Sequence, residues 1–170
     1  MLMKNIILTG MPGSGKSTTG VVLAKTLGRA FIDTDLVIQE RTGRFLQEII
    51  DTDGPEAFLK IEEEAILALE RRNAVIATGG SVVLIPRAME HLKETGIIVC
   101  LAISFEEMVQ RLDDISSRGV ALLPGQDLRT MYQERVPLYT KYADITVDVT
   151  RESFEKRIGT ILYELEQYHV

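Results

Sequence analysis

Residues 10–17 form a glycine-rich loop that ends in a lysine and a serine. They read Gly-Met-Pro-Gly-Ser-Gly-Lys-Ser, a full match to the pattern G-x-x-x-x-G-K-[ST]. Glycines let backbone N–H groups point inward and cradle phosphate oxygens, and a following helix aims its positive end at the same place. Lys16 can reach the β- and γ-phosphates, and the Ser17 hydroxyl can ligate Mg²⁺. The loop therefore predicts binding of a nucleoside triphosphate with Mg²⁺.

The nucleotide contacts are assigned to the end of this loop and the start of the following helix. These residues are Gly13, Ser14, Gly15, Lys16, Ser17 and Thr18.

Asp33 and Asp35 stand two positions apart, directly after a short apolar segment. Carboxylates at the carboxyl end of a strand are well placed for metal and acceptor binding, because ligands of α/β folds bind at that edge. An equally good interpretation is that one of them caps the next helix. A second Asp-Thr-Asp, at residues 51–53, precedes Gly54 and Pro55, so a helix-ending turn explains it. Only the first pair is a candidate site.

Short apolar segments alternate with longer amphipathic segments along the chain. Strands are predicted at residues 5–8, 30–32, 74–77, 97–101 and 145–149. Helices are predicted at residues 18–27, 35–42, 45–50, 55–71, 86–95, 105–112, 127–139 and 153–168. Nearly continuous apolar strands are typical of a parallel sheet buried on both faces. The alternation predicts an α/β fold, with helices flanking a five-stranded parallel sheet, in a single domain over residues 1–170.

Residues 113–126 break this alternation. They contain two glycines and a proline between two helical segments. A loop of that length inside a compact domain is usually functional. We interpret it as a mobile lid; the alternative is a merely variable surface loop.

Composition narrows the classes of function. The chain has 170 residues, 45% hydrophobic, with a formal net charge of -6 and its basic residues scattered. That distribution argues against a nucleic-acid partner. The single cysteine, Cys100, lies in an apolar segment and is expected to be a buried thiol. The apolar segment at residues 5–8 is too short for a membrane span or a signal peptide, so we expect a cytoplasmic monomer.

A phosphate loop by itself does not define the reaction, since GTPase switches, motors and small-molecule kinases all use one. A chain of 170 residues leaves no room for motor machinery, and no Asn-Lys-x-Asp run specifies guanine. A kinase for a small molecule is therefore favoured. The alternative from another class is a regulatory module that binds ATP without transferring its phosphate.

The chain resembles the shikimate kinase family over nearly its whole length. The matching segments, in the family's order, are residues 10–17, 33–35, 41–43, 53–54 with Phe58 and Glu62, 78–80, and 135–139. The resemblance implies a three-layer P-loop kinase fold with an acceptor-binding helical region at about residues 34–62 and a lid at about 113–126. It also implies transfer of the γ-phosphate of ATP to shikimate, giving shikimate 3-phosphate in aromatic amino-acid biosynthesis.

The resemblance implies roles for single residues around the acceptor and the metal. Asp33 would hold Mg²⁺ through water, while Ser17 would bind it directly. Asp35 would accept a hydrogen bond from the acceptor hydroxyl and is the candidate base. The backbone at Gly79 and Gly80 would approach the acceptor closely.

Four arginines receive roles in the same way. Arg135 would clamp the acceptor's carboxylate, because a planar guanidinium gives bidentate geometry. Arg118, in the lid, would join Lys16 in neutralising charge in the transition state. Arg111 and Arg151 would line the adenine and phosphate side. Without the resemblance, Arg135 could pair with a surface carboxylate, Arg111 could lie on a solvated helix face, and Arg151 could cap the last helix.

The chain departs from the family pattern on the acceptor side. Leu59 stands where the family has an arginine that grips the shikimate carboxylate, and Lys60 does not replace it because adjacent helix positions point about 100° apart. Ser81 replaces the usual third glycine, and residues 118–121 read Arg-Gly-Val-Ala in place of Arg-Pro-Leu-Leu. The runner-up function is therefore a kinase for another small hydroxy acid or amino alcohol, with homoserine the leading candidate.

Overall fold

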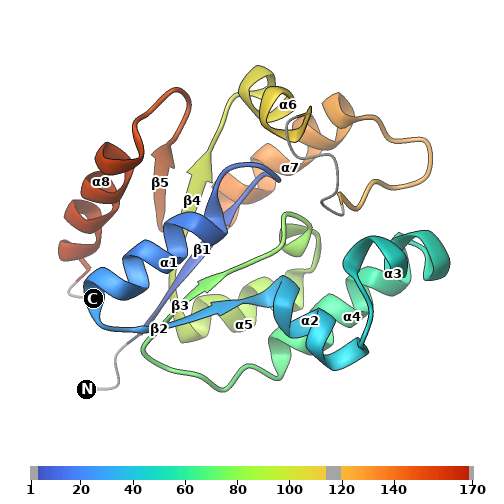
Figure 1. The fold of residues 1–170 in the computed structure, drawn as a ribbon, viewed down its shortest axis with the longest axis horizontal. Helices are drawn as coiled ribbons and strands as arrows, with labels where there is room; N and C mark the ends of the chain where they lie inside the picture. The colour runs from blue at the N-terminus through green and yellow to red at the C-terminus, as the bar shows by residue number, and fades with distance from the viewer. Residues whose placement is uncertain (1–3, 114–119, 169–170) are drawn as a thin grey trace.

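The fold is a parallel β-sheet with helices on both faces (Figure 1), seen in a computed structural model that describes residues 4–113 and 120–168. Five strands lie in the order β2-β3-β1-β4-β5, and every neighbouring pair is parallel. The strands are β1 (Asn5–Gly10), β2 (Ala30–Asp33), β3 (Ala74–Ala77), β4 (Gly96–Ala102) and β5 (Ile145–Asp148). The predicted α/β fold with a five-stranded parallel sheet is confirmed.

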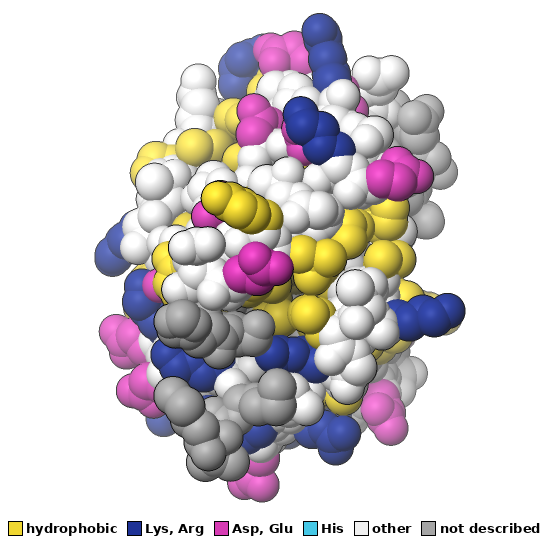
Figure 2. Space-filling view, turned by 90° about the vertical axis from the view of Figure 1, so that its left-hand side faces the viewer, with side chains coloured by type: hydrophobic (Ala, Val, Ile, Leu, Met, Phe, Trp, Pro, Cys, Tyr) yellow, Lys and Arg dark blue, Asp and Glu magenta, His cyan; other side chains and the backbone are white. Residues whose placement is uncertain are grey.

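The helices complete a three-layer arrangement. They are α1 (Lys16–Leu27), α2 (Thr34–Thr42), α3 (Leu46–Asp53), α4 (Pro55–Leu67), a short 3₁₀ helix η1 (Val82–Leu84), α5 (Pro86–Thr95), α6 (Phe105–Asp113), α7 (Leu128–Tyr142) and α8 (Phe154–Glu166). Helices α1 and α8 pack against each other on one face of the sheet, and α5 and α7 lie on the other (Figure 1). On the face seen in Figure 2, acidic and basic side chains are interspersed with apolar ones.

Several predicted boundaries differ from the structure by a few residues, and two of the differences have a clear physical reason. The helix expected over residues 55–71 ends at Leu67, and the chain then turns through Asn73, which has a positive φ of 56°. Gly96, between the helix predicted at residues 86–95 and the strand predicted at 97–101, is the first residue of β4 and pairs with Asn5. A Cβ atom there would lie 2.5 Å from the Asn5 carbonyl oxygen, so the glycine is required by close strand packing.

The hydrophobic core has a main part around the sheet and a smaller second part. In the main part, every residue of β1 and β3 is buried, which explains their continuous apolar sequences. The second part consists of Ile38, Leu46, Ile49, Phe58, Ala65 and Ala121. These residues hold α2, α3 and α4 together, and Ala121 connects them to the end of the predicted lid. The region at about residues 34–62 thus packs around its own small core.

The carboxyl ends of the central strands lie at one edge of the sheet. The glycine-rich loop leaves β1 there, Asp33 ends β2, and Thr78 follows β3. The Thr78 N–H and hydroxyl both donate to the Leu8 carbonyl oxygen, at 3.1 and 2.9 Å, which fixes the β3 end against β1. No helix in the described part of the chain is long and apolar enough to span a membrane.

Because β4 is packed on both faces, truncating its side chains should be costly. Ile98 is fully buried, and we expect Ile98→Ala to lower the free energy of unfolding by about 2–5 kcal/mol. The matched control is Val21→Ala on α1, where 49% of the side chain is exposed and the effect should be small. Urea unfolding of both variants measures this difference, and equal losses would contradict the assignment of β4 to the core.

Candidate active site

The glycine-rich loop wraps around the Lys16 side chain. Its ammonium group donates to the carbonyl oxygens of Gly10 and Met11, at 2.8 and 2.9 Å. The Ser14 N–H closes the turn by donating to the Met11 carbonyl oxygen at 3.1 Å. Gly15, with a left-handed φ of 88°, is the N-cap of α1. The N–H groups at the start of that helix therefore face the same space as the lysine.

Ser17 and Asp33 lie together beside the loop, as the predicted metal site requires. The Ser17 hydroxyl donates to Asp33 Oδ2 at 2.6 Å, and the Asp35 N–H donates to Asp33 Oδ1 at 3.0 Å. Asp33 is therefore both the N-cap of α2 and the neighbour of Ser17, so the two interpretations of this residue hold at once. The described residues contain no cluster of three or more His, Cys, Asp and Glu side chains that could hold a metal ion. One hydroxyl and one carboxylate suit Mg²⁺, which keeps several waters and shares phosphate oxygens.

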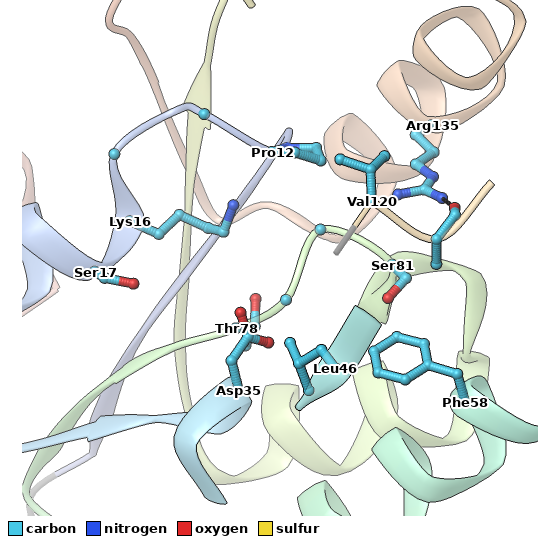
Figure 3. A pocket seen from close by; sticks show the side chains of 15 residues that line it. Pro12, Lys16, Ser17, Asp35, Leu46, Phe58, Thr78, Ser81, Val120 and Arg135 are labelled. Carbon is cyan, nitrogen blue, oxygen red and sulfur yellow. Dashed lines mark hydrogen bonds between the residues drawn. The ribbon is translucent and has the colours of Figure 1, made fainter. Parts of the chain in front are cut away.

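A cleft of about 610 Å³, open to solvent, runs from the phosphate loop to Arg135. Figure 3 shows Lys16 and Ser17 toward one end and Arg135 at the other, with Asp35 lower in the view, below Lys16. The lining residues are Pro12, Gly13, Gly15, Lys16, Ser17, Asp35, Leu46, Phe58, Thr78, Gly79, Gly80, Ser81, Val120, Ala121 and Arg135. The nucleotide and acceptor ends predicted from sequence thus share one continuous space.

Arg135 is held rigidly at the acceptor end. Only 1% of it is exposed, and its Nη2 donates to the Ala121 carbonyl oxygen. Burial lowers the pKa of the guanidinium, while Tyr139 and Glu62 raise it, and the group stays protonated. From the next turn of α7, the Tyr139 hydroxyl donates to the Gly80 carbonyl oxygen. Helix α7 therefore fixes both the arginine and the glycine segment of the cleft.

Gly79 and Gly80 allow a close approach of neighbouring groups. A Cβ atom at Gly79 would lie 2.7 Å from Glu62 Oε1 and 3.1 Å from Asp35 Oδ1. A Cβ atom at Gly80 would lie 2.8 Å from Cδ of Pro12. Glycine at these positions lets the phosphate loop and two carboxyl groups pack directly against this turn.

Comparison with known proteins identifies the family to which this chain belongs. The family model described as shikimate kinase matches residues 12–166. The chain belongs to the shikimate kinase family.

Its relatives match over almost their whole length. It is 39% identical to a shikimate kinase of Thermodesulfovibrio yellowstonii, covering 97% of this chain and 96% of that one. It is 38% identical to a shikimate kinase of Caldanaerobacter subterraneus subsp. tengcongensis, covering 91% of each. A shikimate kinase from Acinetobacter baumannii, solved in complex with shikimate, superposes with a TM-score of 0.89 at 32% identity, covering 98% of this chain and 94% of that one. The predicted family and its P-loop kinase fold are confirmed.

The remaining predicted nucleotide-side arginines have different positions. Arg111 contacts the loop: its Nη1 donates to the Gly13 carbonyl oxygen at 3.2 Å, and Glu107 pairs with it at 3.0 Å. Arg151 is exposed, with a positive φ of 53°, and no described contact brings it to the loop. Thr18 is exposed on the first turn of α1. Arg118 lies outside the described residues.

The turn of α4 that departs from the shikimate kinase pattern supplies no cation to the cleft. Leu59 packs against the main hydrophobic core, and Lys60 is exposed. Among the described residues, neither lines the cleft. Arg135 is thus the guanidinium that the described part of the chain places at the acceptor end.

Glu62 was assigned no site role from sequence, although it lies directly behind the cleft. It is fully buried, and its Oε2 accepts a hydrogen bond from the Ser81 hydroxyl at 2.6 Å. Burial raises the pKa of this carboxyl to about 7; the Ser81 hydrogen bond opposes the rise, and Asp35 adds to it. A sequence signal existed, because Glu62 is four residues after Phe58 and so shares the apolar face of an amphipathic helix.

Glu62 should make stability depend on pH. Because its pKa is raised from 4.5 to about 7, its contribution is largest below pH 4.5 and is lost as the pH rises through 7. For one group the loss is at most about 1.4 kcal/mol per pH unit. We expect Glu62→Gln to gain stability relative to the unmodified protein between pH 5 and pH 8, as measured by thermal unfolding. Glu64→Gln, at an exposed position of the same helix, is the control; parallel pH curves for all three proteins would contradict the assignment.

Proposed function

We propose that the protein phosphorylates a hydroxyl of shikimate with Mg·ATP, giving shikimate 3-phosphate. Family membership makes the chain an ATP-dependent phosphotransferase. The observation that carries the proposal is that Lys16, Asp35 and Arg135 all line one cleft. A polyphosphate, a reacting hydroxyl and a carboxylate can therefore be bound in the same space.

On the nucleotide side, the loop positions the phosphates. Its inward N–H groups and the positive end of α1 would hold the β- and γ-phosphates. Lys16, already held by the Gly10 and Met11 carbonyl oxygens, would turn its ammonium toward the transferred phosphoryl group. Ser17 would bind Mg²⁺ directly and Asp33 would bind it through water. Bound Mg²⁺ neutralises charge that develops on the phosphate oxygens.

On the acceptor side, we propose that two side chains orient shikimate. Arg135 is proposed to bind its carboxylate in bidentate fashion. Asp35 is proposed to accept the proton of the attacking hydroxyl, or at least to orient that hydroxyl in line with the phosphate. Because Leu59 supplies no second guanidinium, Arg135 would carry this recognition with the backbone of Gly79 and Gly80. Catalysis would then come mostly from positioning and charge neutralisation.

The other predicted residues complete the proposal. Arg118, in the lid over residues 113–126, would neutralise charge on the transferred group. Arg111 and Arg151 would face the adenine side, and Arg111 has the contact with Gly13 that supports this. Closure of the lid would exclude water from the reaction. A monomeric, cytoplasmic enzyme fits a small-molecule kinase that needs no partner.

The acceptor is tested by measuring ADP release with shikimate, homoserine and a few sugar acids side by side. We expect turnover to depend on shikimate, with Lys16→Ala as the inactive control. Faster turnover with homoserine would replace the proposed acceptor and leave the kinase assignment in place. ATP hydrolysis that no added metabolite stimulates would favour a regulatory ATP-binding module instead.

Replacing Arg135 should affect the KM for shikimate much more than the KM for ATP. Arg135→Lys keeps the charge but loses the bidentate geometry, and a lost charge-assisted contact weakens binding by roughly 1.5–3 kcal/mol. We therefore expect the KM for shikimate to rise at least about tenfold, while the KM for ATP changes by less than about twofold. Steady-state kinetics measure both constants. Equal increases in the two KM values would count against a carboxylate-binding role.

A further inference from the structure

Arg157 is a buried cation beside the phosphate loop, and neither the sequence motifs nor the proposed function accounts for it. It lies on α8, which packs against α1, and only 6% of it is exposed. Its Nη1 lies 3.5 Å from the Thr19 hydroxyl. A Cβ atom at Gly15 would lie 2.7 Å from the same nitrogen, so the guanidinium is pressed against the loop at the first residue before α1.

The charge of Arg157 is only partly compensated in the described part of the chain. No described carboxylate forms an ion pair with it, its Nε is buried without a hydrogen-bond partner, and the Phe154 ring centre lies 5.7 Å from the guanidinium carbon. Burial lowers the pKa of the guanidinium, Arg111 lowers it further, and Glu152 partly restores it. A buried charge without a counterion is costly in free energy.

The position of the guanidinium against the N-terminal end of α1 makes the free-energy cost of its burial larger. Gly15 and Thr19 lie at the N-terminal end of α1, where the helix dipole is positive and repels a cation. Arg29 is a useful contrast, because it is also buried but lies just past the C-terminal end of α1, where a cation is favoured. Arg29 donates to the Lys4 carbonyl oxygen at 2.7 Å. The two buried arginines thus lie at opposite ends of one helix.

An anion bound on the phosphate loop would compensate for the buried positive charge of Arg157. We propose that Arg157 is a positioning residue for the nucleotide phosphates, adding positive charge to the loop from the side of Gly15 and Thr19. This inference rests on the proposed nucleotide site and extends it to a residue 138 positions away from Thr19 in the chain. Arg157 acts through the loop, by holding Gly15 in place and by its field.

The test is binding of ATP and of inorganic tripolyphosphate, without any acceptor, to Arg157→Met and Arg157→Lys by calorimetry. We expect Arg157→Met to weaken both ligands by about tenfold, since both carry the phosphate charge, and Arg157→Lys to retain most of the affinity. Arg29→Met is the matched control and should bind both ligands like the unmodified protein. Thr19→Val, which removes the hydroxyl beside the guanidinium, should weaken binding less than Arg157→Met.

Thermal unfolding adds a second measurement, the rise in Tm caused by ADP, which a loss of packing alone would not change. The rise in Tm on adding ADP should shrink in Arg157→Met but not in Arg29→Met. Unchanged affinities in Arg157→Met, or equal losses in Arg157→Met and Arg157→Lys, would overturn the inference while leaving the proposed function standing. If Arg157→Met does not fold, the comparison of Arg157→Lys with Thr19→Val decides, and unchanged affinity in Thr19→Val would overturn it. Absence of ATP binding in the unmodified protein would overturn both proposals.

Discussion

The structure depends on a backbone turn that wraps around a lysine at the end of the central strand. Such a turn is stable only if the strand before it is fixed and the helix after it starts at the right place. Both conditions are met by burial: β1 lies in the middle of the sheet, with every residue buried, and α1 packs on β2 and β3. The Lys16 ammonium then joins the two ends of the turn through carbonyl oxygens.

The acceptor side is built on the same edge of the sheet by different means. Its groups come from α2, from the turn after β3 and from α7, and no single segment holds them. Tyr139 and Arg135 on α7 fix the Gly80 and Ala121 carbonyl oxygens, and Ser81 is fixed by Glu62. Because these are contacts between separate elements, a substitution in one of them changes the pocket without changing the fold. The departure from the family pattern at Ser81 is of this kind, whereas Leu59 packs against the main core and does not line the cleft.

The sequence predicted best what depends on neighbouring residues. A buried strand needs a continuous apolar segment and a phosphate loop needs glycines at fixed spacing, so the sheet and the loop were predictable from local patterns. The pairing of Ser17 with Asp33 was expected only from the resemblance to the family, because the local sequence left Asp33 open as a helix cap. Glu62 and Arg157 were missed for the opposite reason. Glu62 meets Ser81 across 19 positions, and Arg157 meets Thr19 across 138. The helix face shared with Phe58 indicates that Glu62 is buried, but nothing local identifies Ser81 as its partner. Nothing in the local pattern around Arg157 shows that it lies against the phosphate loop.

The two ends of the cleft differ in their electrostatic character. At the nucleotide end, α1 points its positive end into the loop, and Lys16, Arg111 and Arg157 surround it, so the site is arranged for an anion of high charge. At the acceptor end, Arg135 is the guanidinium that the described residues supply, and the carboxyl groups of Asp35 and Glu62 lie close to the glycine turn of the same cleft. The positive charge there is partly offset, so this end discriminates by geometry more than by charge. Because Leu59 adds no second guanidinium, recognition there rests on the direction of that one group.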